Sequence, residues 1–82
     1  MTVDAGKDRM LRLDFAQSVL HKDLDVGLFD LSGRLVETLF AGRLSSLHLA
    51  LPLNRAELRT GAYMLRISLD NFTLIKNNIL FN

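Results

Sequence analysis

The chain of 82 residues has no cysteine and no tryptophan, a single proline and a net charge of only +1. The absence of cysteine excludes disulfides and thiolate chemistry, and it is compatible with the cytosol, the periplasm or the exterior. The small net charge, with basic residues scattered singly, argues against a nucleic-acid partner. No apolar run approaches the roughly 18–20 residues that span a membrane, so we expect no membrane span.

Hydrophobic residues are plentiful, at 49% of the chain. A domain of this size buries only about 60% of its unfolded surface, so it needs a dense apolar core to be stable alone. The length allows one domain. Residues 1–8 are small and polar, without the apolar centre of a signal peptide. We expect them to be a linker or an added segment that precedes a domain over residues 9–82.

Apolar and polar residues alternate in several short segments, which is the pattern of half-buried β-strands. The pattern predicts strands over residues 9–15, 24–28, 47–51 and 61–69, followed by a return strand over residues 72–81. Pro52 is expected to end the third of these strands. Asn54 is placed to cap a single helical turn that reaches Leu58. Asp70 and Asn71 are expected to form the turn before the return strand.

The segment Asp30-Leu31-Ser32-Gly33 predicts a tight hairpin turn. Aspartate can accept hydrogen bonds from backbone amides just downstream, and glycine takes a positive φ at no steric cost. Residues 34–40 follow with apolar side chains that do not alternate strictly, and this spacing predicts a strand with a bulge. A short helix between Gly33 and Gly42 is the alternative, although it would have barely two turns. About six or seven strands at a spacing of roughly ten residues predict an all-β, antiparallel sandwich.

Three blocks resemble the C-terminal sorting domain of the type IX secretion system, an Ig-like β-sandwich at the end of secreted bacterial proteins. Asp30–Val36 with Leu39 is similar to its D-x-x-G-R-x-V-x-x-L hairpin, and Leu58–Ile67 is similar to its L-x-x-G-x-Y-x-x-x-I block. Lys76–Phe81 is similar to its closing strand. A related Ig-like module of the flagellar hook-capping protein shares the first two blocks. The family usually opens with a segment rich in Asn and Pro, and residues 1–8 contain neither.

The resemblance implies a secretion signal rather than an enzyme. Such a domain is recognised by the outer-membrane translocon, and a cell-surface sortase then removes it and attaches the cargo to lipopolysaccharide. The expected location is therefore the cell surface or the exterior, reached through the periplasm as part of a larger precursor. The candidate recognition residues are Gly33, Arg34, Gly61, Tyr63, Arg66, Lys76, Asn77 and Asn78.

Six of these candidates also have a structural interpretation. The two glycines suit turns, and the two arginines suit a solvated strand surface. Tyr63 suits the core, with its hydroxyl reaching a loop carbonyl. Lys76 suits an edge strand, where lysine discourages aggregation.

Residues that could carry catalysis or bind a metal show no supporting pattern. His21 and His48 stand far apart without partners at ligand spacing. A calcium site from Asp23, Asp25 and Asp30 would lack the dense loop that calcium needs. No serine has the context of a nucleophile elbow, and no glycine-rich phosphate loop is present. We therefore expect no enzyme, no cofactor and no metal.

Two alternatives to the secretion signal belong to other functional classes. An Ig-like interaction module would hold a protein partner by strand addition along residues 72–81, and the apolar end of this strand also suits a homodimer. A carbohydrate-binding module needs a row of exposed aromatic rings. An aromatic content of 7% without tryptophan supplies little for that purpose.

Overall fold

The computed structural model describes residues 1–5, 10–53, 61–70 and 72–81, with the side chains of residues 5 and 77–81 left out. Its elements are β1 (Thr2–Ala5), β2 (Met10–Asp14), a 3-10 helix η1 (Gln17–Val19), β3 (Asp23–Phe29), β4 (Leu35–Arg43), β5 (His48–Pro52), β6 (Gly61–Leu69) and β7 (Phe72–Phe81). No helix among the described residues is long and apolar enough to cross a membrane.

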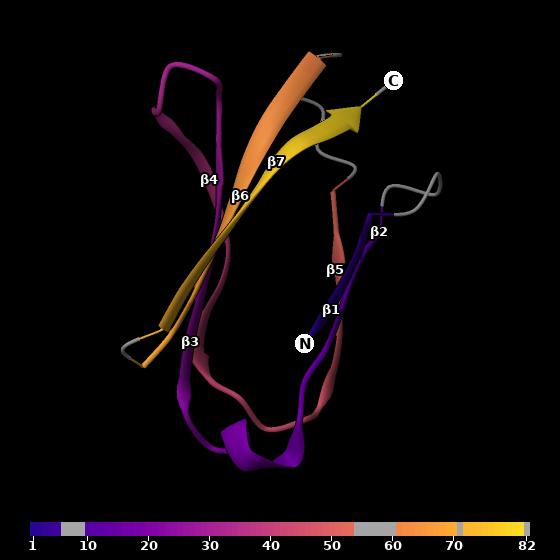
Figure 1. Cartoon of the computed structure of the whole chain (residues 1–82), viewed down its shortest axis with the longest axis vertical. Helices are drawn as coiled ribbons and strands as arrows, with labels where there is room; N and C mark the ends of the chain where they lie inside the picture. Colours follow the sequence, from indigo (N-terminus) through magenta and orange to yellow (C-terminus); the bar gives the residue numbers. More distant parts are fainter. Residues whose placement is uncertain (6–9, 54–60, 71, 82) are drawn as a thin grey trace.

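The strands form two antiparallel sheets that face each other (Figure 1). One sheet has the order β1-β2-β5 and the other has the order β4-β3-β6-β7. This order corresponds to an Ig-like arrangement in which β3, β6 and β7 take the places of strands C, F and G, with β4 added beside β3. The predicted small antiparallel β-sandwich is confirmed, and the described residues contain seven strands.

The core lies between the sheets because alternate residues of each strand face inward. In β6, Tyr63, Leu65, Ile67 and Leu69 are buried, as their period-two spacing predicts. The other buried apolar side chains are Leu11, Leu13, Phe15, Leu24, Val26, Leu28, Leu44 and Leu53. Leu44 and Leu53 lie outside the strands and cover the core from connecting segments.

The N-terminal residues correct one expectation. Thr2–Ala5 forms strand β1 and pairs with residues 11–14 of β2, so the prediction of a linker over residues 1–8 is wrong for this part. Val3 lies opposite Leu13 and packs against the core. Burial of this one inward side chain, together with the backbone hydrogen bonds of the pair, orders a segment whose four residues are too few to show a periodic pattern.

The segment after the hairpin turn is a strand, and the alternative of a short helix is wrong. Register shifts between Val26 and Gly27 and between Leu28 and Phe29 leave extra residues on β4, which confirms the predicted bulging. The strand also continues to Arg43 instead of ending near Phe40, because its last residues pair with the start of β3. The predicted helical turn over residues 54–58 lies outside the described residues.

Candidate functional site

The hairpin turn between β3 and β4 is built around one carboxylate. Oδ1 of Asp30 accepts hydrogen bonds from the Ser32 hydroxyl at 2.6 Å, the Ser32 backbone N–H at 3.0 Å and the Arg34 backbone N–H at 3.0 Å. These bonds, above all the one from the Ser32 hydroxyl, lower the pKa of Asp30 below its usual range. Gly33 has φ of 90°, which confirms the turn that the sequence predicts. The Arg34 side chain is exposed, with Nε 3.6 Å from Oδ2 of Asp30.

The outer face of the four-stranded sheet brings two of the predicted residues together. Gly33 and Arg66 line a shallow pocket of about 180 Å³ with Phe29, Met64 and Ile75. The Arg66 guanidinium carbon lies 4.7 Å from the centre of the Phe29 ring, at the distance of a cation–π contact. Arg34 follows Gly33 on the same hairpin and is thus next in sequence to a residue of this pocket, whereas Arg66 lies in the middle of β6, opposite Gly27.

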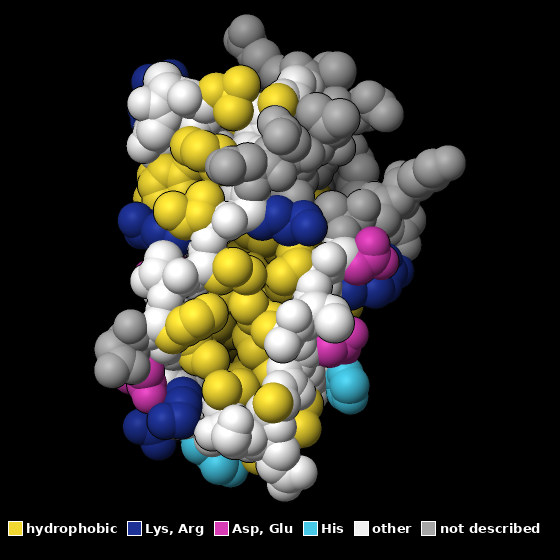
Figure 2. All heavy atoms as spheres, in the orientation of Figure 1, with side chains coloured by type: hydrophobic (Ala, Val, Ile, Leu, Met, Phe, Trp, Pro, Cys, Tyr) yellow, Lys and Arg dark blue, Asp and Glu magenta, His cyan; other side chains and the backbone are white. Residues whose placement is uncertain are grey.

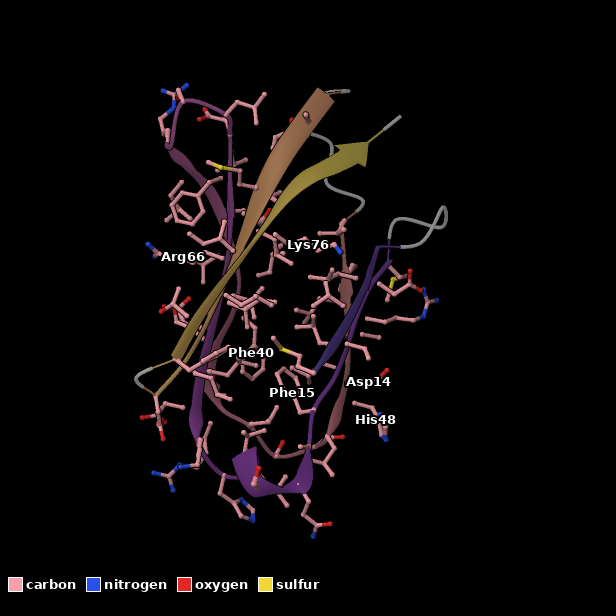
Figure 3. The ribbon with its side chains drawn as sticks, viewed as in Figure 1. Asp14, Phe15, Phe40, His48, Arg66 and Lys76 are labelled. Atoms are coloured by element: carbon pink, nitrogen blue, oxygen red, sulfur yellow. The ribbon has the colours of Figure 1, made fainter. Side chains whose placement is uncertain are left out.

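The remaining predicted residues lie elsewhere. Tyr63 is only 9% exposed and belongs to the core, so its ring is not available as a platform for a ligand. Gly61 begins β6, opposite Phe81. Lys76 lies opposite the inward-facing Leu65, yet its side chain is exposed because β7 is an edge strand. It points from β7 toward the three-stranded sheet (Figure 3). The predicted set therefore does not form one surface.

Asn77 and Asn78 lie at an irregular point of β7. The register shifts between Tyr63 and Leu65 of β6, and β7 has one more residue than β6 across this interval. A bulge of this kind twists an edge strand locally and interrupts its regular pairing. The two asparagines are thus placed by their backbone at a break in the ladder, and their side chains are outside the description.

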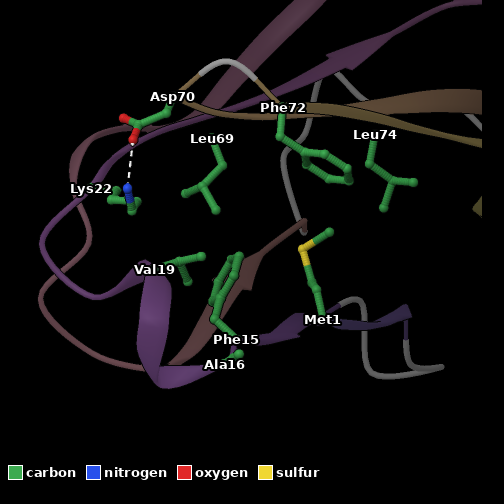
Figure 4. A pocket seen from close by; sticks show the side chains of 9 residues that line it. All are labelled: Met1, Phe15, Ala16, Val19, Lys22, Leu69, Asp70, Phe72 and Leu74. Atoms are coloured by element: carbon green, nitrogen blue, oxygen red, sulfur yellow. Dashed lines mark hydrogen bonds and ion pairs between the residues drawn. The ribbon is translucent and has the colours of Figure 1, made fainter.

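An apolar hollow that sequence reasoning missed opens between the edge strands β1 and β7. We call it the β1–β7 cleft (Figures 2 and 4). Its volume is about 450 Å³. Its lining consists of Met1, Phe15, Ala16, Val19, Lys22, Leu69, Asp70, Phe72 and Leu74. Lys22 and Asp70 form an ion pair at one end, with Nζ 3.1 Å from Oδ2. The alternating pattern of β7 already places residues 72 and 74 on its inner face. The cleft itself forms only because the edges of the two sheets lie next to each other, which the sequence does not show.

A second feature that the sequence did not reveal is a polar cluster on the outer face of the three-stranded sheet. Asp14 lies between Thr2 and His48, because β2 pairs with both β1 and β5. Nδ1 of His48 is 2.6 Å from Oδ1 of Asp14, and the Thr2 hydroxyl donates to Oδ2 at 3.1 Å. These two hydrogen bonds, first that of His48, lower the pKa of Asp14.

The order of this cluster does not match a catalytic triad. In a triad the histidine stands between the carboxylate and the hydroxyl, so that it can take the hydroxyl proton. Here Asp14 stands in the middle, and its two neighbours both bond to it rather than to each other. Among the residues that the structure describes, no three His, Cys, Asp or Glu side chains are grouped closely enough to hold a metal ion.

Comparisons of the chain with protein-family models, with curated proteins and with solved structures found no match. The likeness to the type IX sorting domain therefore depends on the three sequence blocks themselves. Two of these blocks include described residues of hairpin β3–β4 and of β6, and the third is the end of β7.

Proposed function

We propose that this chain is a non-catalytic sorting module, which directs a larger protein through the type IX secretion machinery to the bacterial surface. The proposal has its main support in one observation: the three resembling blocks belong to consecutive strands of a single sheet, β4-β3-β6-β7. The first block spans the β3–β4 turn, the second runs along β6 and the third closes β7. The three blocks are therefore neighbours in the backbone of one sheet, although their candidate side chains do not share one face of it.

The position of β7 adds to this argument. It pairs with β6 along one side, and no described strand pairs with its other side. Unpaired backbone N–H and C=O groups along such an edge are available to another protein. A receptor that binds the closing block would therefore contact it at the edge of the four-stranded sheet.

The test is an export assay. Residues 1–82 are fused to the C-terminus of a periplasmic reporter in a bacterium with a type IX system, and surface reporter is measured by antibody labelling of intact cells. We expect surface labelling that disappears when residues 76–82 are deleted and when the host lacks the translocon. A reporter that stays in the periplasm although the intact module is folded would contradict the proposal.

Because the deletion shortens a strand, a point variant provides a sharper version of the assay. Lys76→Ala removes an exposed cation of the closing block and leaves β7 intact. Lys22→Ala is the matched control, since it removes a lysine in the β2–β3 connection, outside the three blocks. We expect reduced export for the first variant only.

The second candidate function is an interaction module that binds a protein by strand addition at β7. The observation that favours it is that β7 combines an unpaired edge with exposed apolar side chains, Phe72 and Ile75. A homodimer through the same edge belongs to this class. Sedimentation of the purified chain, followed by pull-down against defined partner proteins, distinguishes this function from export.

A further inference from the structure

The two faces of β7 differ in chemistry. Phe72, Leu74 and Lys76 are opposite the inward-facing residues Leu69, Ile67 and Leu65 of β6, so these three side chains point toward the space between the sheets. Along this inner face the order is aromatic, aliphatic and then cationic. Because the side-chain period of a strand is two, any strand that pairs with the free edge of β7 would place every second side chain beside these three.

The β1–β7 cleft continues this inner face. Phe15 and Val19 line it from the β2–β3 connection, and Met1 lines it from the position just before β1 (Figure 4). Phe72 remains 56% exposed although it faces inward. Among the described residues, the cleft is therefore an apolar hollow that no side chain fills, beside an edge of β7 that no described strand pairs with.

The two lysines near the cleft differ in their ion pairing. At one end, Lys22 is paired with Asp70. Farther along β7, Lys76 is exposed, and no ion pair joins it to another residue in the described part of the chain. Its side chain points across the gap toward the three-stranded sheet (Figure 3). An occupant of the cleft would thus meet apolar side chains first and then one ammonium group.

We propose that the β1–β7 cleft binds an extended segment of a partner protein, which pairs with β7 as an added antiparallel strand. The segment carries two apolar side chains, at alternate positions, that pack beside Phe72 and Leu74, and a carboxylate that pairs with Lys76. The antiparallel direction follows the described sheets, in which every strand pair is antiparallel. This inference rests on the strand-addition function above and is independent of export.

In the antiparallel direction, the acidic residue precedes the two apolar ones in the partner. The probe is a fluorescent peptide, Ser-Thr-Glu-Thr-Leu-Thr-Val-Thr-Ser-Gly, titrated with the purified full chain and followed by fluorescence polarisation. We expect saturable binding, accompanied by slower amide hydrogen exchange along β7. Absence of saturable binding would overturn the proposal, whatever the export assay shows.

Two matched variants on β7 test which face binds. Phe72 and Ile75 are exposed to similar extents, 56% and 58%, but they point to opposite faces of the strand. We expect Phe72→Ala to weaken peptide binding about ten-fold, since apolar contact area is lost. Ile75→Ala should change it less than about two-fold, because that side chain points away from the cleft. Equal losses in both variants would place the peptide outside the cleft and overturn the proposal.

A charge exchange tests the partner's carboxylate. Lys76→Glu should weaken the Glu-containing peptide about five-fold or more, and it should strengthen binding of the same peptide with Lys in place of Glu. Arg34→Glu is the control, because it makes the same change in charge on the β3–β4 hairpin. If Arg34→Glu weakens peptide binding equally, the effect comes from the net charge of the protein. The proposed pairing of the peptide carboxylate with Lys76 would then be wrong. Self-association of the chain that Phe72→Ala abolishes would instead assign the cleft to a second copy.

Discussion

The sandwich is closed at one end and open along one side, and the two regions are built differently. At the closed end, the β2–β3 and β4–β5 connections cross between the sheets and are joined by backbone hydrogen bonds (Figure 1). His21 N–H donates to the carbonyl of Leu44, and Leu44 N–H donates to that of Lys22, both at 2.8 Å. Along the open side, β1 and β7 are the last strands of their sheets, no connection in the described part of the chain crosses between them, and Phe72 stays exposed.

The difference shows what closes a small sandwich. A connection that crosses between the sheets inserts apolar side chains into the gap and satisfies its own polar backbone groups by hydrogen bonds. Two edge strands that belong to different sheets cannot do this for each other, since their backbone groups point along the sheets rather than across the gap. The open side therefore keeps both unpaired backbone groups and accessible apolar side chains.

The largest expected effect comes from breaking the closed end. Leu44 is 0% exposed, so Leu44→Ala leaves a cavity and should lower the free energy of unfolding by about 3 kcal/mol. Phe72→Ala, on the open side, should lower the free energy of unfolding by less than about 1 kcal/mol, because the exposed Phe72 ring contributes little buried apolar area. Urea unfolding at neutral pH measures both. Similar losses in the two variants would show that the cleft is filled in solution.

The hairpin of β3 and β4 closes by a local turn. Disrupting this turn should have an intermediate effect on the free energy of unfolding. Gly33 has φ of 90°, and a Cβ added there would meet no atom within 4 Å. Gly33→Ala should therefore cost about 1 kcal/mol through backbone strain alone. Peptide binding in the cleft should stay unchanged. A loss of cleft binding in this folded variant would mean that hairpin and cleft are coupled.

The ion pair at the end of the cleft should contribute least to stability. Lys22 and Asp70 are about half exposed, so solvent screens their attraction. We expect Lys22→Ala to lower the free energy of unfolding by about 0.5 kcal/mol or less, with a smaller difference from wild type at high salt. A loss above about 1 kcal/mol in urea unfolding would show that this pair helps to close the sandwich.

Acid should weaken the hairpin of β3 and β4. The lowered pKa of Asp30 means that its charged form favours the folded state, so its contribution is complete above the unfolded pKa of about 4 and is lost as pH falls through the folded pKa. Ser32→Ala removes the main hydrogen bond and should raise the pKa of Asp30, as measured by NMR titration of its carboxyl carbon. The pKa of Asp14 should not move, since His48 and Thr2 hold it. An unchanged Asp30 pKa would contradict this account.

Local patterns predicted much of the fold. Alternation in β2, β3, β5 and β6 assigned inward and outward side chains correctly, because side-chain direction in a strand repeats every two residues. The turn at residues 30–33 followed from the chemistry of aspartate and glycine. Even the bulged strand β4 was visible in its irregular apolar spacing.

What local patterns could not supply was the pairing of distant residues. Asp14 and His48 are neighbours only because β2 and β5 pair in one particular register. The division of the predicted recognition residues among the hairpin, the core and the edge strand had the same cause. The sequence did not predict strand β1. This strand adds only one inward side chain, Val3, to the core and is otherwise held by its pairing with β2, so it shows no periodic pattern.

By itself, the sequence determined that this protein is a cysteine-free β domain with a tight Asp30–Gly33 turn, since periodicity and turn chemistry act within a few residues. Only the tertiary structure decided which strands became edges, where connections crossed the gap between the sheets, and that β1 and β7 would border an open apolar cleft. These outcomes depend on register and on the meeting of segments more than fifty residues apart, and no short stretch of sequence contains that information.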